Sequence, residues 1–143
     1  MKTSILKLFL FPLIMIITFV GCKKEEFLEF QLHESGCNWI NTAQNEIIVI
    51  NSNTELEKHI DCSYSEFPEF DFSKHTLLLA SGQANRGVYE ITGQLKHFSK
   101  NNHTLDLTIL LNSTQIMENW TYSILVSKLS NKAHIRLKTK YIN

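Results

Sequence analysis

Apolar and polar residues alternate along the second half of the chain in four successive segments. Because the side chains of a β-strand point to opposite faces in turn, a period of two predicts strands with one buried and one exposed face. Tyr89, Ile91 and Leu95 are expected on the buried face of the first of these strands. The strands predicted in this way cover residues 88–96, 104–111, 120–127 and 133–141.

Two apolar runs come before the alternating segments. Residues 47–50 and 77–80 contain no polar side chain, which is typical of strands that are buried on both faces. Between them, Ser52 and Glu55 have the spacing of a capping box, in which each side chain binds a free backbone N–H group of the first helical turn. This pattern predicts a short helix from about Asn53 to Ile60.

The remaining segments have the composition of connections. Asp61 to Ser73 mixes aromatic residues with acids and contains Pro68, which favours a loop over a strand. Gly82 to Gly87 and Lys100 to His103 are predicted turns. Together these patterns predict a mainly β domain of about six mostly antiparallel strands, in a small sandwich or partly open barrel with one short helix.

The first 21 residues differ from the rest of the chain. They hold Lys2 and Lys7, no acid, and an apolar stretch from Leu8 to Val20. Such a stretch is short for a membrane span and typical of the hydrophobic region of a secretion signal. The alternative is a membrane helix from Ile5 to Val20 with the following two lysines as its cytoplasmic flank.

The residues after this stretch resemble a bacterial lipobox, in which small residues precede a cysteine that accepts a diacylglycerol and becomes the new N-terminus; here they are Phe19-Val20-Gly21-Cys22. The next four, Lys23-Lys24-Glu25-Glu26, resemble the surface-export signal of lipoproteins in Bacteroidetes-type bacteria. A solvated tether is the alternative for these four residues. The resemblance implies a signal peptide over residues 1–21, a lipid on Cys22, and an anchored, surface-exposed protein of the bacterial outer membrane.

The signal also changes the charge balance. The full chain has 14 Lys and Arg and 14 Asp and Glu. Without Lys2 and Lys7, 12 bases stand against 14 acids, a net charge of −2. This charge argues against a nucleic-acid partner, because phosphate binding needs a basic field. The remaining chain divides into a lipidated N-terminus, tether and irregular lead over residues 22–44 and a single β-rich domain over residues 45–143.

The cysteines predict a disulfide. With Cys22 assigned to the lipid, Cys37 and Cys62 remain as a pair in an oxidising compartment. A bridge between them closes a loop of about 25 residues, for which chain entropy predicts about 3 kcal/mol of stabilisation. Two free thiols are the alternative. Neither cysteine lies in a C-x-x-C motif and the six histidines lack metal-site spacing, so no metal is expected.

Two groups of residues are candidates for binding. The first is the aromatic cluster Tyr64, Phe67, Phe70 and Phe72, which lies among acids and suits stacking on a glycan or protein. Its alternative role is to cap the core beneath a loop.

The second group lies along the last predicted strand. His134, Arg136, Lys138 and Lys140 share one face of this strand. They fit an acidic partner or an anionic membrane surface, or else they keep an edge strand from pairing with other chains. The sequence leaves both roles open.

No pattern of residues predicts catalysis or a cofactor. There is no G-x-S-x-G turn and no pair of carboxylates in a buried segment. The glycine turn from Ser81 to Gly87 lacks the Lys-Ser/Thr ending of a phosphate loop. The chain is therefore not expected to be an enzyme.

One resemblance covers about half of the chain. Asp71-Phe72-Ser73-Lys74 before an apolar strand, then Val88-Tyr89-Glu90-Ile91, the aromatic-led strand Trp120 to Leu129 and a last strand from Ala133 to Tyr141 follow one after another. This order is similar to the C-terminal domain of small bacterial lipoproteins that associate with a surface serine protease. The resemblance implies an all-β module that binds or stabilises a partner protein, such as a surface protease. A carbohydrate-binding lipoprotein of a nutrient-uptake system is the alternative.

Overall fold

The computed structural model describes residues 28–29, 36–63 and 66–143, and this part of the chain is mainly β. Six of its strands have four residues or more, which confirms the predicted number, and the single helix is short. The elements are β1 (Leu28–Glu29), β2 (Asn38–Trp39), β3 (Ile47–Ile50), α1 (Asn53–Leu56), β4 (Ile60–Asp61), β5 (His75–Ala84), β6 (Val88–Ser99), β7 (Asn102–Leu111), β8 (Glu118–Ser127) and β9 (His134–Ile142).

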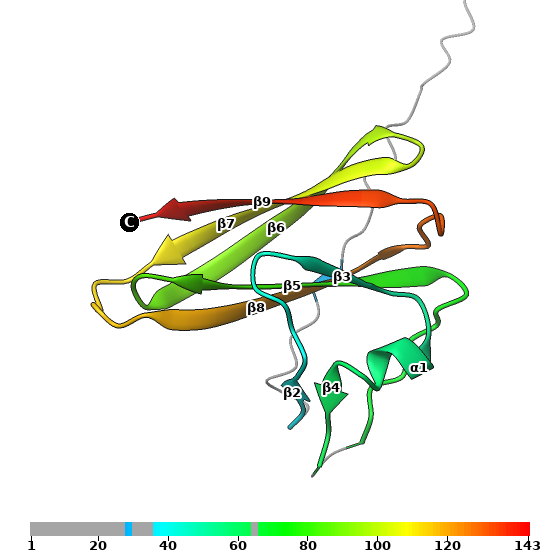
Figure 1. The fold of residues 1–143 in the computed structure, drawn as a ribbon, viewed down its shortest axis with the longest axis horizontal. Coiled ribbons are helices and arrows are strands. Elements are labelled where there is room, and N and C mark those ends of the chain that lie inside the picture. Colours follow the sequence, from blue (N-terminus) through cyan, green and yellow to red (C-terminus); the bar gives the residue numbers. More distant parts are fainter. Residues whose placement is uncertain (1–27, 30–35, 64–65) are drawn as a thin grey trace, which may run out of the picture.

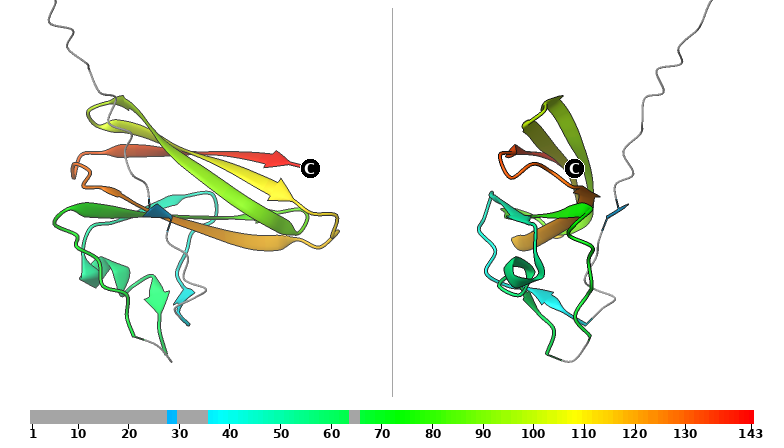
Figure 2. Two further views of the ribbon diagram at one scale, coloured as in Figure 1. Left: turned by 180° about the vertical axis from the view of Figure 1, so that it is seen from behind. Right: turned by 90° about the vertical axis from the view of Figure 1, so that its right-hand side faces the viewer.

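The long strands form two sheets that pack as an open sandwich (Figure 1). One sheet has the order β1-β8-β5-β3, and the other, called here the outer sheet, has the order β6-β7-β9. A small lobe made of α1 and the pair β2-β4 lies below the first sheet in Figure 1. The end-on view in Figure 2 shows the three layers side by side. The predicted sandwich is therefore confirmed.

Apolar side chains bury the first sheet on both faces. Leu78 and Ala80 point into the core between the two sheets. Leu77 and Leu79 alternate with them and point into a second core between the first sheet and the lobe. This arrangement explains the uninterrupted apolar run from Leu77 to Ala80 in β5, because every position of that run meets a hydrophobic layer. The predicted run 47–50 forms β3, but as the edge strand of its sheet, with Val49 exposed.

One pairing in the outer sheet departs from the antiparallel pattern. β7 pairs with β6 antiparallel through a hairpin, whereas β9 pairs with β7 parallel. The chain reaches β9 from β8, which belongs to the other sheet, so no hairpin sets the direction of β9. The alternation along β9 predicts its buried face and is the same for either direction.

The helix is shorter than the capping box predicts. It ends at Leu56, and Ile60 begins β4 instead, where it pairs with Trp39 of β2. One half of the capping box forms as predicted: the Ser52 hydroxyl accepts a hydrogen bond from the Glu55 N–H group. The Glu55 carboxylate accepts one from the Asn51 N–H group at 2.6 Å. Pairing with β2 therefore overrides the helical preference of the last residues.

Gly82 lies inside β5 and not in a turn as predicted, because β5 continues to Ala84. The Trp120 indole packs directly against Gly82, so closely that an added Cβ atom would overlap the ring. The glycine is needed here for the close approach of the Trp120 ring to the backbone of β5 and not for the geometry of a turn.

Tyr89 faces solvent, and the prediction that it shares a buried face with Ile91 is wrong. A β-bulge lies between Val88 and Glu90, where the register with β7 shifts by one residue. The bulge lets Val88 and Ile91 both pack against the core and turns Tyr89 outward, with 74% of its surface exposed.

Candidate protein-binding surface

The lobe is held together by the disulfide that the sequence predicts. Cys37 and Cys62 are bonded, with their Cα atoms 4.2 Å apart. The bond lies next to the pairing of Asn38 with Asp61, so it ties the two short strands of the lobe to one another. Such short strands bury little surface by themselves, which makes the covalent bond important for the lobe.

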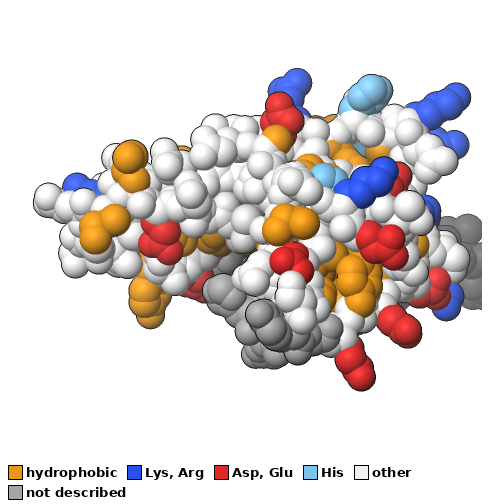
Figure 3. Space-filling model, turned by 60° about the horizontal axis from the view of Figure 1, so that its bottom comes forward, with side chains coloured by type: hydrophobic (Ala, Val, Ile, Leu, Met, Phe, Trp, Pro, Cys, Tyr) orange, Lys and Arg blue, Asp and Glu red, His pale blue; other side chains and the backbone are white. Residues whose placement is uncertain are grey.

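Two of the four candidate aromatic residues pack into the second core. Phe70 and Phe72 are half-buried against it, and their ring centres lie 5.8 Å apart. Phe67 is 36% exposed, and Tyr64 lies outside the described residues. Figure 3 shows this side of the molecule, where Asp and Glu side chains surround a patch of hydrophobic side chains. Phe70 and Phe72 therefore stabilise the lobe, and Phe67 alone of the described three is available to a ligand.

One acid of this region, Asp71, has a lowered pKa. Asp71 accepts hydrogen bonds from Lys74 and from the hydroxyl and N–H groups of Ser73. The hydrogen bond from Lys74, followed by that from the Ser73 hydroxyl, lowers the pKa of Asp71 to about 2. All three residues are exposed and form the turn that leads into β5. The interaction therefore belongs to the structure of this turn.

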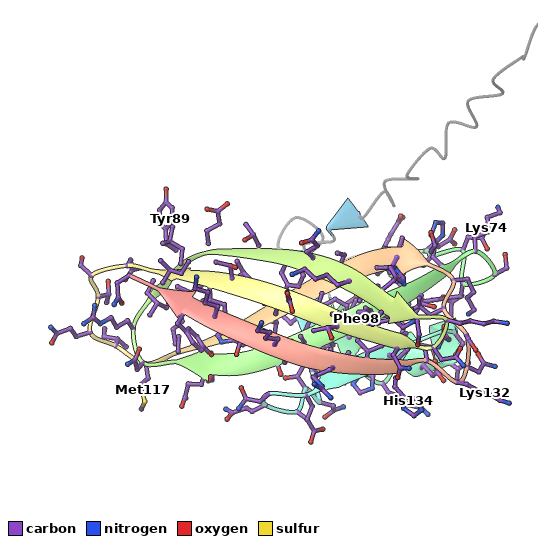
Figure 4. All side chains as sticks on the ribbon, turned by 90° about the horizontal axis from the view of Figure 1, so that it is seen from above. Lys74, Tyr89, Phe98, Met117, Lys132 and His134 are labelled. Atoms are coloured by element: carbon purple, nitrogen blue, oxygen red, sulfur yellow. A yellow bond between two sulfur atoms is a disulfide. The ribbon has the colours of Figure 1, made fainter. Side chains whose placement is uncertain are left out.

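The basic residues of β9 lie together on the outer sheet, as predicted. His134, Arg136, Lys138 and Lys140 are exposed and point away from the core, while Ile135 and Leu137 pack into it. We call these four exposed residues the basic edge, because β9 is the last strand of its sheet. Figure 4 looks onto this sheet and shows His134 at the start of β9.

The charge of the basic edge is not neutralised by the rest of the described chain. Asp106 is the acid opposite Lys138 on β7, but it forms its salt bridge with Lys96 of β6. In residues 28–29, 36–63 and 66–143, no carboxylate lies within salt-bridge distance of Arg136, Lys138 or Lys140. The basic edge is therefore a concentrated positive surface on a domain, residues 45–143, that holds 10 Lys and Arg and 10 Asp and Glu.

The far end of β9 is fastened to the other sheet. The Tyr141 hydroxyl accepts a hydrogen bond from Trp120 Nε1 at 3.3 Å and donates one to the Gln83 carbonyl oxygen at 3.2 Å. These bonds connect β9 to β8 and β5 across the sandwich. The basic edge is thus carried by a strand that is held in place at its end as well as along β7.

The sequence analysis missed two features of β6. Tyr89 and Phe98 are the most exposed large apolar side chains in the part of the chain that the structure describes, at 74% and 72%. Both lie at bulges, one near each end of β6. The alternation of residues gives no sign of these bulges, because each one depends on the pairing with β7.

Some sequence predictions concern residues that the structure does not describe, and others concern metal ligands and membrane helices. Cys22 and the signal segment are not among the described residues. Among those that are, no three His, Cys, Asp or Glu side chains are grouped to hold a metal ion, and no helix has the length and apolar character of a membrane span.

Comparison with known proteins gives no match: no family model, no curated protein and no solved structure is similar to this chain.

Proposed function

We propose that the chain is a lipid-anchored protein of the bacterial outer membrane or cell surface, whose β-domain binds or stabilises a partner protein without catalysis. The observation that carries this proposal is the basic edge. Three positively charged side chains, those of Arg136, Lys138 and Lys140, lie at alternate positions of β9 and face solvent. None of them has a carboxylate partner among the described residues. The surface that fits them is an acidic region of a partner, such as a surface protease.

The row of charges on the basic edge favours partner binding over a role that only prevents pairing between edge strands. Lysines on an edge strand prevent pairing between copies of the same strand, and the basic edge has this effect too. Protection alone, however, does not require that every outward position from Arg136 to Lys140 carry a positive charge. A continuous row of like charges raises the rate of encounter with an acidic partner as well as repelling a wrong one.

The anchor in this proposal is the lipid on Cys22. Replacing Cys22 by Ala removes the only atom that accepts the diacylglycerol, so we expect loss of labelling by a radioactive fatty acid and release of the protein from membranes. The measurement is labelling and fractionation of cells that express either form. If the variant stays in the membrane fraction, the N-terminal segment is a membrane helix instead.

Carbohydrate binding receives less support from the same structure. A glycan platform needs exposed rings, and Phe70 and Phe72 use theirs to cover the second core. One exposed ring, that of Phe67, remains of the described part of the cluster.

The test of partner binding compares charge variants of the intact lipoprotein. The triple variant Arg136→Gln, Lys138→Gln, Lys140→Gln removes the charge of the basic edge and keeps β9. A matched control, Lys58→Gln, Lys74→Gln, Lys100→Gln, removes three exposed lysines that lie outside β9. After cross-linking on membranes and purification, we expect one defined protein to be recovered with the wild type and the control, and at least tenfold less of it with the triple variant.

Two results oppose the proposal. Recovery of the same protein in equal amounts from the triple variant would show that the basic edge is not the binding surface. Recovery of no defined partner with the wild type, at low salt and under gentle solubilisation, would count against partner binding itself.

A further inference from the structure

The outer sheet has a second open edge, along β6. β6 is the first strand of the order β6-β7-β9, so β7 is its neighbour on one side and no strand of the described residues lies on its other side. Among the described residues, no backbone hydrogen bond outside the pairing with β7 reaches the stretch from Glu90 to Lys96. An edge strand of this length presents a row of free N–H and C=O groups to any chain that can lie beside it.

The residues of β6 are arranged symmetrically about Gly93. On the exposed face, Glu90 and Lys96 stand three places to either side of Gly93, and Thr92 and Gln94 stand one place to either side. On the inner face, the apolar residues Ile91 and Leu95 stand two places away. An antiparallel copy of β6 centred on Gly93 therefore meets opposite charge with opposite charge and apolar with apolar side chains.

The same arrangement covers the exposed aromatic residues. Tyr89 and Phe98 lie toward opposite ends of β6 (Figure 4). In an antiparallel pair centred on Gly93, Tyr89 of each copy lies opposite His97 of the other copy and next to its Phe98. Two rings that are exposed in the single chain then come into contact at each end of the seam, which is the line along which the two β6 strands meet. This contact buries apolar surface.

The other open edge does not suit a second copy. An antiparallel pair of β9 strands centred on Lys138 places Lys138 against Lys138 and Arg136 against Lys140. Like charges directly opposite one another destabilise strand pairing. Charge therefore distinguishes the two edges of the outer sheet: β9 repels its own copy, and β6 complements it.

We propose that two copies of this protein associate through their β6 strands, antiparallel about a two-fold axis at Gly93, so that their three-stranded outer sheets form one continuous sheet. Each copy contributes the same residues, as expected of a symmetric dimer. The pairing buries little surface besides one strand edge and the two aromatic contacts. The association is therefore weak in solution, and the basic edges stay free at the outer sides of the joined sheet.

Cysteine cross-linking tests the register. Thr92 of one copy lies opposite Gln94 of the other, so full-length Thr92→Cys and Gln94→Cys chains with different epitope tags are co-expressed and oxidised in isolated membranes. Gly93 is unsuitable as a cross-linking site, because an added Cβ atom would overlap the Tyr122 ring. The matched control is Thr108→Cys, which lies beside Thr92 on β7 and one strand further from the seam.

We expect a reducible product of twice the chain mass that carries both tags from the Thr92→Cys and Gln94→Cys pair, and at least tenfold less from two Thr108→Cys chains. Equal yields from the two pairs, or no product from either, would overturn the proposal.

Charge exchange tests the chemistry of the seam. Glu90→Lys and Lys96→Glu each place like charges opposite one another twice in the symmetric pair, and we expect each to weaken association by about tenfold to a hundredfold. The double variant restores opposite charges across the seam and should recover most of the loss. Association is measured as cross-linking yield against the surface density of the Thr92→Cys and Gln94→Cys chains that carry these changes.

Lys96 also forms a salt bridge with Asp106 in its own chain, so each variant is checked by thermal unfolding. Lys96→Gln removes the charge without reversing it and should give an intermediate yield. If folded single variants cross-link as well as the parent, or if the folded double variant stays as weak as the singles, β6 is not the dimer surface.

Discussion

Gly82→Ala is expected to destabilise the protein, against the usual effect of replacing a strand glycine. Replacing glycine by alanine where there is room for the methyl group raises the free energy of unfolding by about 0.4–1 kcal/mol, because alanine restricts the unfolded chain. At Gly82, the added methyl group would lie within the space of the Trp120 ring, and Trp120 is almost fully buried. The ring has to move, which costs about 1–3 kcal/mol for overpacking.

Movement of Trp120 also affects the attachment of β9. Its Nε1 atom donates to the Tyr141 hydroxyl, which in turn donates to Gln83. Losing the first bond costs about 1 kcal/mol. The sum of the two costs, less the gain from the alanine, is a loss of about 1–3.5 kcal/mol in the free energy of unfolding. For a domain of this size, we expect Tm to fall by about 3–14 °C.

Thermal unfolding followed by Trp fluorescence measures this effect, since Trp120 is itself a reporter. Gln83→Ala is the matched control on the same strand. Its exposed side chain donates a hydrogen bond to Asn119, and the effect of the substitution should stay within about 0.5 kcal/mol. In a Trp120→Leu background the cost of Gly82→Ala should vanish, because the smaller side chain leaves room for the methyl group. An unchanged or higher Tm for Gly82→Ala in the wild-type background would refute the reasoning.

Two further predictions concern the lobe and the turn before β5. Reduction of the protein, or the double variant Cys37→Ser, Cys62→Ser, should lower the free energy of unfolding by about 3 kcal/mol, because the bond closes a loop of about 25 residues in the unfolded chain; equal Tm values with and without reductant would contradict this. The pKa of Asp71 is lowered to about 2 by its hydrogen bonds with Lys74 and Ser73. A carboxylate whose pKa is lower in the folded than in the unfolded state stabilises the fold above the unfolded value, and the contribution disappears as pH falls from about 4 to about 2. NMR titration of the Asp71 carboxyl carbon should therefore give a midpoint near 2, and Lys74→Ala should raise it; a midpoint near 4 in the wild type would show that the hydrogen bonds do not form in solution.

The candidate binding residues show how far sequence patterns reach. Alternation is enough to place Arg136, Lys138 and Lys140 on one exposed face, because the face of a strand depends only on local backbone geometry. Whether a ring such as Phe70 faces a ligand or a core is a different question. The answer depends on α1, β2 and the disulfide, which pack around the second core from distant parts of the chain.

The errors have related causes. The orientation of Tyr89 depends on a bulge that forms only in the pairing of β6 with β7. Gly82 has the composition of a turn, and only the approach of Trp120, 38 residues further along, shows why the glycine is needed inside a strand. The helix ends early because Ile60 pairs with Trp39.

The sequence by itself determined where the six longer strands lie, which faces of β5, β7, β8 and β9 are buried, and which two cysteines are available to form the disulfide. These properties follow from local periodicity and from simple counting. The tertiary structure alone decided which strands share a sheet, that β9 runs parallel to β7, and that β6 and β9 are the two open edges of the outer sheet. Strand order and direction arise from pairing between distant segments, and many arrangements satisfy the same alternation. The two surfaces proposed here for partner binding and self-association both depend on that order, because an edge exists only once its sheet has formed.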